Sequence, residues 1–217
     1  MADILRHLVW NLGRARRLVG LHQQHVKSKK KNDPSRESDD LLRAAIVFAH
    51  ASLEEFLRSC SALLLPKGSA KVLDEIPLAG LNNSGKPEKF LLGRLAEYRG
   101  RTVDDVINES VQQYLQKTSY NSSSDVAAAL ERCGLDINRI KNFLSSIDEM
   151  IKRRHQIVHR VDRDFSNRKR KLVATRITAK QAMVWIYQVL KMLLNIFGDF
   201  YDKHGALRLS IKNNFAS

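Results

Sequence analysis

The residues best suited to chemistry are an arginine and two histidines in the stretch 151–162, which reads Ile-Lys-Arg-Arg-His-Gln-Ile-Val-His-Arg-Val-Asp. Apolar residues upstream step by three and four, as on the buried face of a helix: Ile137, Ile140, Leu144, Ile147 and Ile151. The same spacing continues to Arg154. We therefore expect this guanidinium on the buried face, where it needs a partner, a cavity or an interface. His155 and His159 lie on the neighbouring face, so the three side chains cluster at one edge.

An arginine beside two histidines suits acid–base chemistry on an anionic substrate. Histidine titrates near neutral pH, so it can take or give a proton. Arginine can hold a phosphate and stabilise the charge that develops on it. RNA supplies its own nucleophile, the 2′-hydroxyl, so Arg154, His155 and His159 suffice as catalytic candidates. A structural alternative stays open, in which Arg154 pairs with Glu54 or Glu55 of an earlier helix and the histidines are satisfied in the core.

Metal and nucleophilic chemistry have less support. His155, His159 and Asp162 have the spacing of metal ligands on one helix face. Five cations surround these residues in the sequence: Lys152, Arg153, Arg154, Arg160 and Arg163. Such concentrated positive charge opposes a dication, so we expect neither a metal nor a cofactor. No Ser or Cys lies in a recognisable nucleophile elbow, and we expect Cys60 and Cys133 to be buried free thiols.

Positive charge is concentrated in two segments of the 217-residue chain, whose net charge is +14. Residues 1–31 carry eight Lys and Arg against one acid, and residues 151–176 carry ten against two, while the remainder is close to neutral. Two basic segments favour a polyanion partner, with nucleic acid the leading candidate and a merely solvated basic surface as the alternative. The RNA-binding candidates are Lys152, Arg153, Arg160 and Arg163. With no membrane-spanning run and no signal-peptide pattern, we expect a cytoplasmic protein.

Helices must position these residues. Apolar periodicity, caps and breakers predict helices over these ranges: 2–30, 37–65, 90–98, 103–115, 125–133, 137–162 and 178–205. Thr102 and Asp105 resemble a capping box. The stretch 66–87 is expected to be irregular or to contain short helical turns, and 163–171 is a basic linker. The fold class is therefore an all-α bundle with long core helices and several shorter ones.

We expect one domain over residues 1–217. Its parts are a basic N-terminal helix at 1–31, a core bundle at 35–204 and a short tail at 205–217.

The chain resembles the HEPN domains. Arg154-His-Gln-Ile-Val-His159 matches their Arg-x4-His motif, including a polar residue directly after the arginine. Three further stretches are similar to the RiboL-PSP-type branch of that family: the flanks of the motif over 147–162, Ala51-Ser-Leu-Glu-Glu-Phe-Leu57, and Tyr120-Asn-Ser-Ser-Ser-Asp125 leading to Gly134-Leu-Asp136. The likeness covers most of residues 35–200 in order.

This resemblance implies a helical bundle that dimerises so that two motif helices face each other. The family includes many metal-independent endoribonucleases, often in bacterial toxin or antiviral systems, in which the motif Arg and His form the active site. These roles carry over to Arg154 and His159, and the polar position carries over to His155. The implied partners are RNA, a second copy of the chain, and an antitoxin or defence-system protein. Some members are inert and serve binding or scaffolding roles, so a non-catalytic RNA- or protein-binding module is the alternative.

The geometry of a single helix also favours a dimer. Positions 154 and 159 are five apart, so at ~100° per residue they do not lie on one line of the helix. A two-fold dimer would bring arginines and histidines from both chains into one cleft. In that arrangement Ile147, Ile151 and Val158 pack against neighbouring helices, while the polar edge opens into the shared groove.

Overall fold

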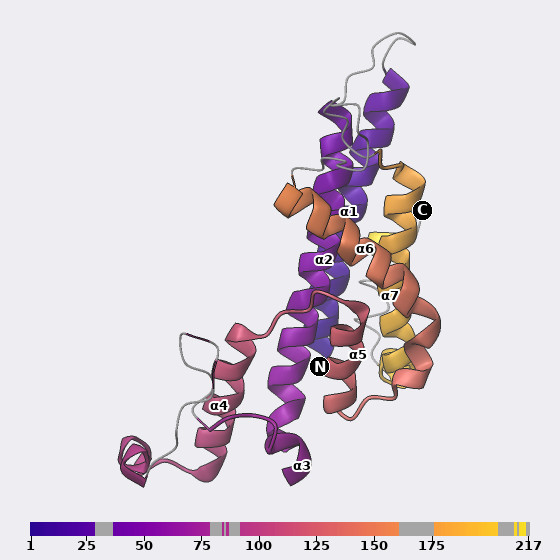
Figure 1. The fold of residues 1–217 in the computed structure, drawn as a ribbon. Coiled ribbons are helices and arrows are strands. Elements are labelled where there is room, and N and C mark those ends of the chain that lie inside the picture. Colours follow the sequence, from indigo (N-terminus) through magenta and orange to yellow (C-terminus); the bar gives the residue numbers. More distant parts are fainter. Residues whose placement is uncertain are drawn as a thin grey trace.

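Two long antiparallel helices, α1 (Ala2–Ser28) and α2 (Glu37–Leu64), lie side by side and form the spine of the fold (Figure 1). The computed structural model describes residues 1–28, 37–78, 84, 86, 92–160, 176–203, 211 and 213–215. Within these ranges every regular element is a helix and no strand is present. The predicted all-α fold class is thus confirmed.

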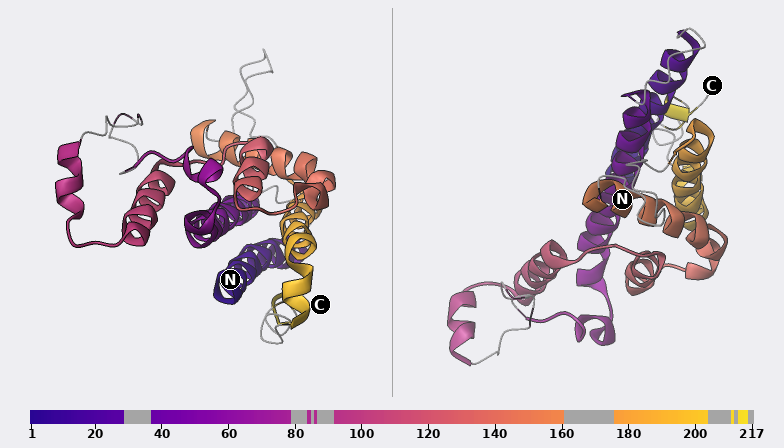
Figure 2. Two further views of the ribbon diagram at one scale, coloured as in Figure 1. Left: turned by 90° about the horizontal axis from the view of Figure 1, so that it is seen from below. Right: turned by 45° about the horizontal axis from the view of Figure 1, so that its top comes forward.

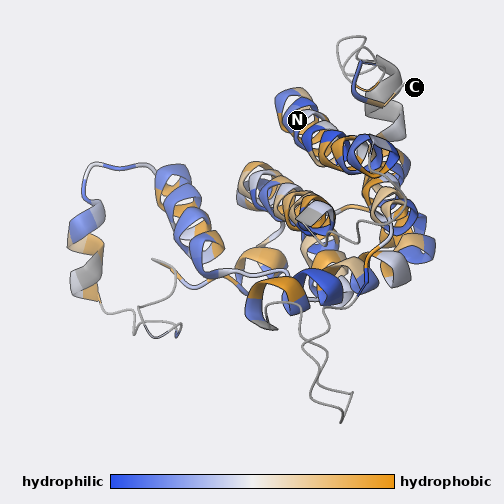
Figure 3. Ribbon diagram, turned by 90° about the horizontal axis from the view of Figure 1, so that it is seen from above, coloured by the Kyte–Doolittle hydropathy of each residue, from blue (hydrophilic) through white to orange (hydrophobic). Residues whose placement is uncertain are grey.

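The α1–α2 pair is held by matching apolar stripes. On α1, Leu5, Leu8 and Leu12 are buried, and on α2 the buried positions include Ala45 and Ala49, whose small side chains allow the helices to approach closely. Each fully buried leucine contributes about 1.5–3 kcal/mol relative to an exposed one. Figure 3 shows apolar residues on the sides of the long helices that face one another and polar residues over much of their outer sides.

Helix α6 (Lys141–Arg160) crosses the α1–α2 pair at an angle, running from beside α7 (Ala179–Lys203) across α2 (Figures 1 and 2). Its residues Ile147, Met150 and Ile151 are fully buried in the main core. Trp185 of α7 donates its indole N–H to Glu149 of α6 at 3.5 Å. The helix that carries the predicted motif is therefore fixed against both α2 and α7.

The chain between α5 (Ser123–Arg132) and α6 contains a defined turn. Gly134 adopts a left-handed conformation with φ 74°. Its N–H bonds to the Glu131 carbonyl at 2.8 Å, and the Leu135 N–H bonds to the Leu130 carbonyl at 3.0 Å. These two bonds are those of a Schellman motif. Asp136 then caps η3 (Ile137–Ile140). This 3-10 helix stands where the sequence predicted the first turn of the motif helix.

A smaller arm stands away from the bundle at the C-terminal end of α2 (Figures 1 and 2). It consists of η1 (Leu65–Lys67), α3 (Ala70–Leu73), η2 (Leu92–Tyr98) and α4 (Val103–Lys117). Leu65, Val111 and Leu115 form its own small apolar cluster. The short helical turns predicted after residue 66 are confirmed in the described part of that stretch. The capping box of α4 is also confirmed, whereas the helix predicted at 90–98 is a 3-10 helix.

Several sequence predictions fall outside the described residues. These are Asp162, Arg163, the basic linker 163–171, Gly205 and most of the tail at 205–217. None of the described helices combines the length and apolar character needed to cross a membrane.

Candidate functional site

Two histidines of α6 contact each other at the protein surface. The rings of His155 and His159, four residues and about one helical turn apart, have centroids 4.3 Å apart and planes inclined at 43°. Both side chains are exposed, and Arg154 beside them is half-buried. Adjacent imidazoles at the surface offer an acid and a base, and Arg154, next to His155 in the sequence, is a candidate anion-binding group.

The buried arginine of α6 is Arg153, not Arg154 as the apolar stripe predicted. Arg153 is 7% exposed and donates from Nη1 to the Gln156 side chain at 3.0 Å. Val158, expected to be sealed against a neighbouring helix, is 46% exposed. Because α6 crosses α2 at an angle, the covered face shifts toward Arg153 and Ile157 near the helix end, and the Arg154–Val158 side is only partly covered.

Beneath the motif lies His50 of α2, which is 1% exposed. Its Nε2 is 3.3 Å from the Tyr120 carbonyl oxygen. A carbonyl can only accept, so this nitrogen donates. The other ring nitrogen, Nδ1, lies 3.6 Å from a carboxylate oxygen of Glu54.

Burial lowers the pKa of His50, Glu54 opposes that shift, and the positive charge of Arg154 lowers the pKa further. Arg154 therefore lies close enough to the His50–Glu54 pair to act on it electrostatically.

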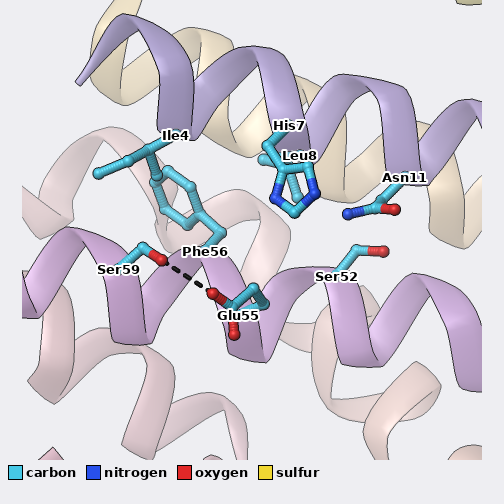
Figure 4. Close-up of a pocket in the computed structure, with 8 residues that line it drawn as sticks. All are labelled: Ile4, His7, Leu8, Asn11, Ser52, Glu55, Phe56 and Ser59. Atoms are coloured by element: carbon cyan, nitrogen blue, oxygen red, sulfur yellow. Dashed lines mark hydrogen bonds between the residues drawn. The ribbon is translucent and has the colours of Figure 1, made fainter.

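The two predicted acidic partners of Arg154 point in different directions. Glu54 lies on the side of α2 that carries His50. Glu55, one residue and about 100° further round the helix, faces α1 and lines a pocket of about 20 Å³ (Figure 4). There it accepts a hydrogen bond from Ser59 at 2.9 Å and lies opposite His7. Only Glu54 is thus placed to influence Arg154, and within the described residues no ion pair joins them.

The predicted RNA-binding residues are dispersed. Lys152 is exposed but forms an ion pair with Asp148 at 2.6 Å. Arg153 is 7% exposed, so little of its side chain is accessible to a ligand in the folded chain. Arg160 ends α6 and Arg163 lies outside the described residues. Within the described part of the chain, no three His, Cys, Asp or Glu side chains are grouped so that they could hold a metal ion.

Sequence reasoning missed His50 and Tyr120. One signal for His50 was available: it precedes Glu54 by four residues, so both lie on one face of an otherwise apolar helix. Tyr120 lies in a polar turn before α5 and gave no sign that it would be buried with its carbonyl beside His50.

Comparison with known proteins identifies a family. The RiboL-PSP-HEPN family model matches residues 12–203. No curated protein and no solved structure matched the chain.

Proposed function

Because the chain belongs to the RiboL-PSP-HEPN family, we propose that it is a metal-independent endoribonuclease in which Arg154 binds the scissile phosphate and His159 transfers a proton. One observation carries the proposal: the contacting imidazoles of His155 and His159 are exposed beside a half-buried arginine. An exposed imidazole pair can reach a substrate, whereas buried and satisfied histidines could not.

The reaction needs only these groups and the RNA. One imidazole takes the proton of the 2′-hydroxyl, whose oxygen attacks the adjacent phosphorus. The bond from phosphorus to the 5′ oxygen breaks, and a protonated imidazole gives its proton to that leaving oxygen. Arg154 stabilises the charge on the phosphoryl oxygens. The products carry a 2′,3′-cyclic phosphate and a 5′-hydroxyl.

A homodimer would complete the site. A single helix holds Arg154 and His159 about 140° apart around its axis, so one chain gives a splayed pair. The exposed Val158 lies between them in sequence and offers an apolar contact for a second copy. A two-fold interface along this side of α6 would bring the motif residues of both chains into one groove. The biological setting that fits such a nuclease is a toxin or antiviral effector, with an antitoxin or defence-system protein as partner.

Incubation with total cellular RNA in excess chelator tests the proposal. We expect His159→Ala to lower the cleavage rate by about 10²–10⁴-fold, because the proton-transfer group is lost. His25→Ala, which removes an exposed histidine of α1, is the matched control and should cleave like the unmodified chain. Identical RNA ends from the unmodified chain and His159→Ala would show that the motif is not catalytic.

The rival is a non-catalytic module that binds RNA or a protein partner. It is favoured by the position of Arg154 next to the His50–Glu54 pair, where a guanidinium could serve packing alone. Under this alternative Arg154 is needed for folding, and no variant of the motif histidines alters RNA ends.

A further inference from the structure

A row of flat side chains crosses from α1 to α2 at the protein surface. The rings of His7 and Trp10 are stacked, with centroids 6.2 Å apart and planes inclined at 12°. The guanidinium carbon of Arg14 lies 5.0 Å from the centre of the Trp10 ring and 4.9 Å from that of Phe48 on α2. Trp10 is 48% exposed and Phe48 is 38% exposed. His7, Trp10, Arg14 and Phe48 thus form one surface, the Trp10 platform, whose rings are accessible from solvent.

The Trp10 platform lies on the opposite side of α2 from the histidine motif. Phe48 precedes His50 by two residues, so about 160° separates their side chains around the helix axis. His50 is the residue beneath the motif. Helix α6 packs against α2 and α7, whereas the platform joins α1 to α2. The platform is therefore a surface separate from the motif.

The charge around the platform is mainly positive. Helix α1 carries five Lys and Arg against one acid. Arg17 is exposed and follows Trp10 by seven residues, so it lies on the same face of α1. The guanidinium of Arg14 meets two rings, yet its N–H groups lie in its own plane and can still donate to an anion. A carboxylate, that of Glu55, lies opposite His7 at one end, where it accepts a hydrogen bond from Ser59 (Figure 4).

We propose that the Trp10 platform binds single-stranded RNA, with bases stacked on the rings of Trp10 and Phe48 and phosphates held by Arg14 and Arg17. Aromatic rings interleaved with arginine are the groups that bind an unpaired strand, because every base has a face that can stack and every linkage has a negative charge. In a duplex the base faces are covered by their neighbours, so the platform favours single strands.

The neighbouring pocket does not serve as a base-binding site. Its volume of about 20 Å³ has room for about one water molecule, so the bases would lie on the platform and not enter the pocket. A protein is the other kind of partner that exposed rings could meet. The guanidinium between the two rings and the positive charge of α1 favour a polyanion. The proposal does not depend on the histidine motif, and the platform would bind RNA whether or not the protein cleaves it.

Binding of a fluorescent 2′-O-methyl oligoadenylate of about ten nucleotides to the full chain tests the platform. This RNA lacks the nucleophilic 2′-hydroxyl, so it stays intact even if the protein is a nuclease. In anisotropy measurements at low salt, Trp10→Ala should weaken binding by about 5- to 100-fold because stacking is lost, and Trp10→Phe should restore most of the affinity. Leu92→Ala truncates an 81% exposed leucine of η2. It is the matched control and should bind like the unmodified chain.

Two further measurements separate stacking from charge. The chain has two tryptophans, and Trp185 is 7% exposed, so a stacked base should quench mainly the fluorescence of Trp10. Trp10→Phe should bind the oligonucleotide with little quenching. Arg17→Ala should reduce the slope of log affinity against log salt by about 1 and leave the quenching in place. It changes an exposed side chain, so it also tests the platform if Trp10→Ala does not fold.

Three results would overturn the proposal. The first is equal affinity for the oligonucleotide in the unmodified chain, Trp10→Ala and Arg17→Ala. The second is binding of inorganic polyphosphate with the same dependence on Trp10, since that ligand has no bases to stack. The third is loss of self-association in Trp10→Ala with RNA affinity unchanged, which would assign the platform to a second copy of the chain. Failure of the nuclease proposal, in which His159→Ala cleaves like the unmodified chain, would leave these binding results unaffected.

Discussion

Arg153 and Arg154 are neighbours in sequence, yet replacing each with alanine should affect stability and RNA cleavage differently. Arg153→Ala removes a buried guanidinium that is hydrogen-bonded to Gln156, so we expect the free energy of unfolding to fall by about 2–3 kcal/mol. Arg154→Ala removes a half-exposed side chain and should cost less than about 1 kcal/mol, while cleavage is lost. Urea denaturation of both variants measures the difference. If Arg154→Ala is as destabilising as Arg153→Ala, the result supports the non-catalytic alternative, in which Arg154 is needed for folding.

His50 should make stability depend on pH. Burial lowers its pKa in the folded chain, so the unfolded chain takes up the proton first as pH falls below about 6.5. The free energy of unfolding should therefore decrease from that pH until the lowered pKa of the folded state is passed. The groups that face His50 are Glu54, Arg154 and the Tyr120 carbonyl.

Melting curves from pH 8 to pH 5 test this dependence. His50→Gln keeps an N–H donor for Tyr120 but cannot titrate, so the pH dependence due to position 50 should disappear. His25→Gln, at an exposed position of α1, should keep the original curve. Parallel curves for the unmodified chain and His50→Gln would mean that position 50 does not titrate differently in the two states.

At the level of helices, periodicity and caps predicted most of the fold. The long helices follow from strong amphipathic stripes, and α4 follows from the Thr102–Asp105 capping box. The apolar stripe of α6 wrongly predicted that Arg154 is the buried arginine. Which face of α6 is covered depends on the angle at which α6 crosses α2, and the sequence of one helix does not specify that angle. The burial of His50 and Tyr120 is likewise a tertiary contact between segments 70 residues apart.

The turn from α5 toward α6 should depend on Gly134. Its φ of 74° suits glycine, and an added Cβ would meet no atom within 4 Å, so the penalty is conformational alone. Gly134→Ala should lower the free energy of unfolding by about 1–2 kcal/mol.

Gly20→Ala is the matched control, since Gly20 lies inside α1 and also has free space. That change should stabilise by roughly 0.5–1 kcal/mol. Thermal denaturation of the two variants should give shifts of opposite sign. A neutral Gly134→Ala would show that the turn relaxes to another conformation.

At the scale of the whole molecule, the oligomeric state tests whether two chains form the proposed shared groove. We expect a homodimer at micromolar concentration in light scattering, with α6 of both chains at the interface. Val158→Asp should give monomers and lower the cleavage rate, because a charge would be placed in the apolar contact. Val184→Asp alters a valine of similar exposure on α7, 38% against 46%, and should remain dimeric. A strict monomer of the unmodified chain would remove the composite groove.

The order in which these helices are synthesised matters for when the motif reaches its final geometry. The α1–α2 hairpin consists of helices adjacent in the chain, and contacts between near neighbours form fastest. Helix α6 is fixed not only by this hairpin but also by α7, through the Trp185–Glu149 hydrogen bond and the core around Met150. During translation α7 emerges after α6, so a ribosome-bound chain lacks one wall of the motif helix. The time needed to translate α7 would therefore separate the synthesis of the motif from the moment at which α6 is packed on both sides.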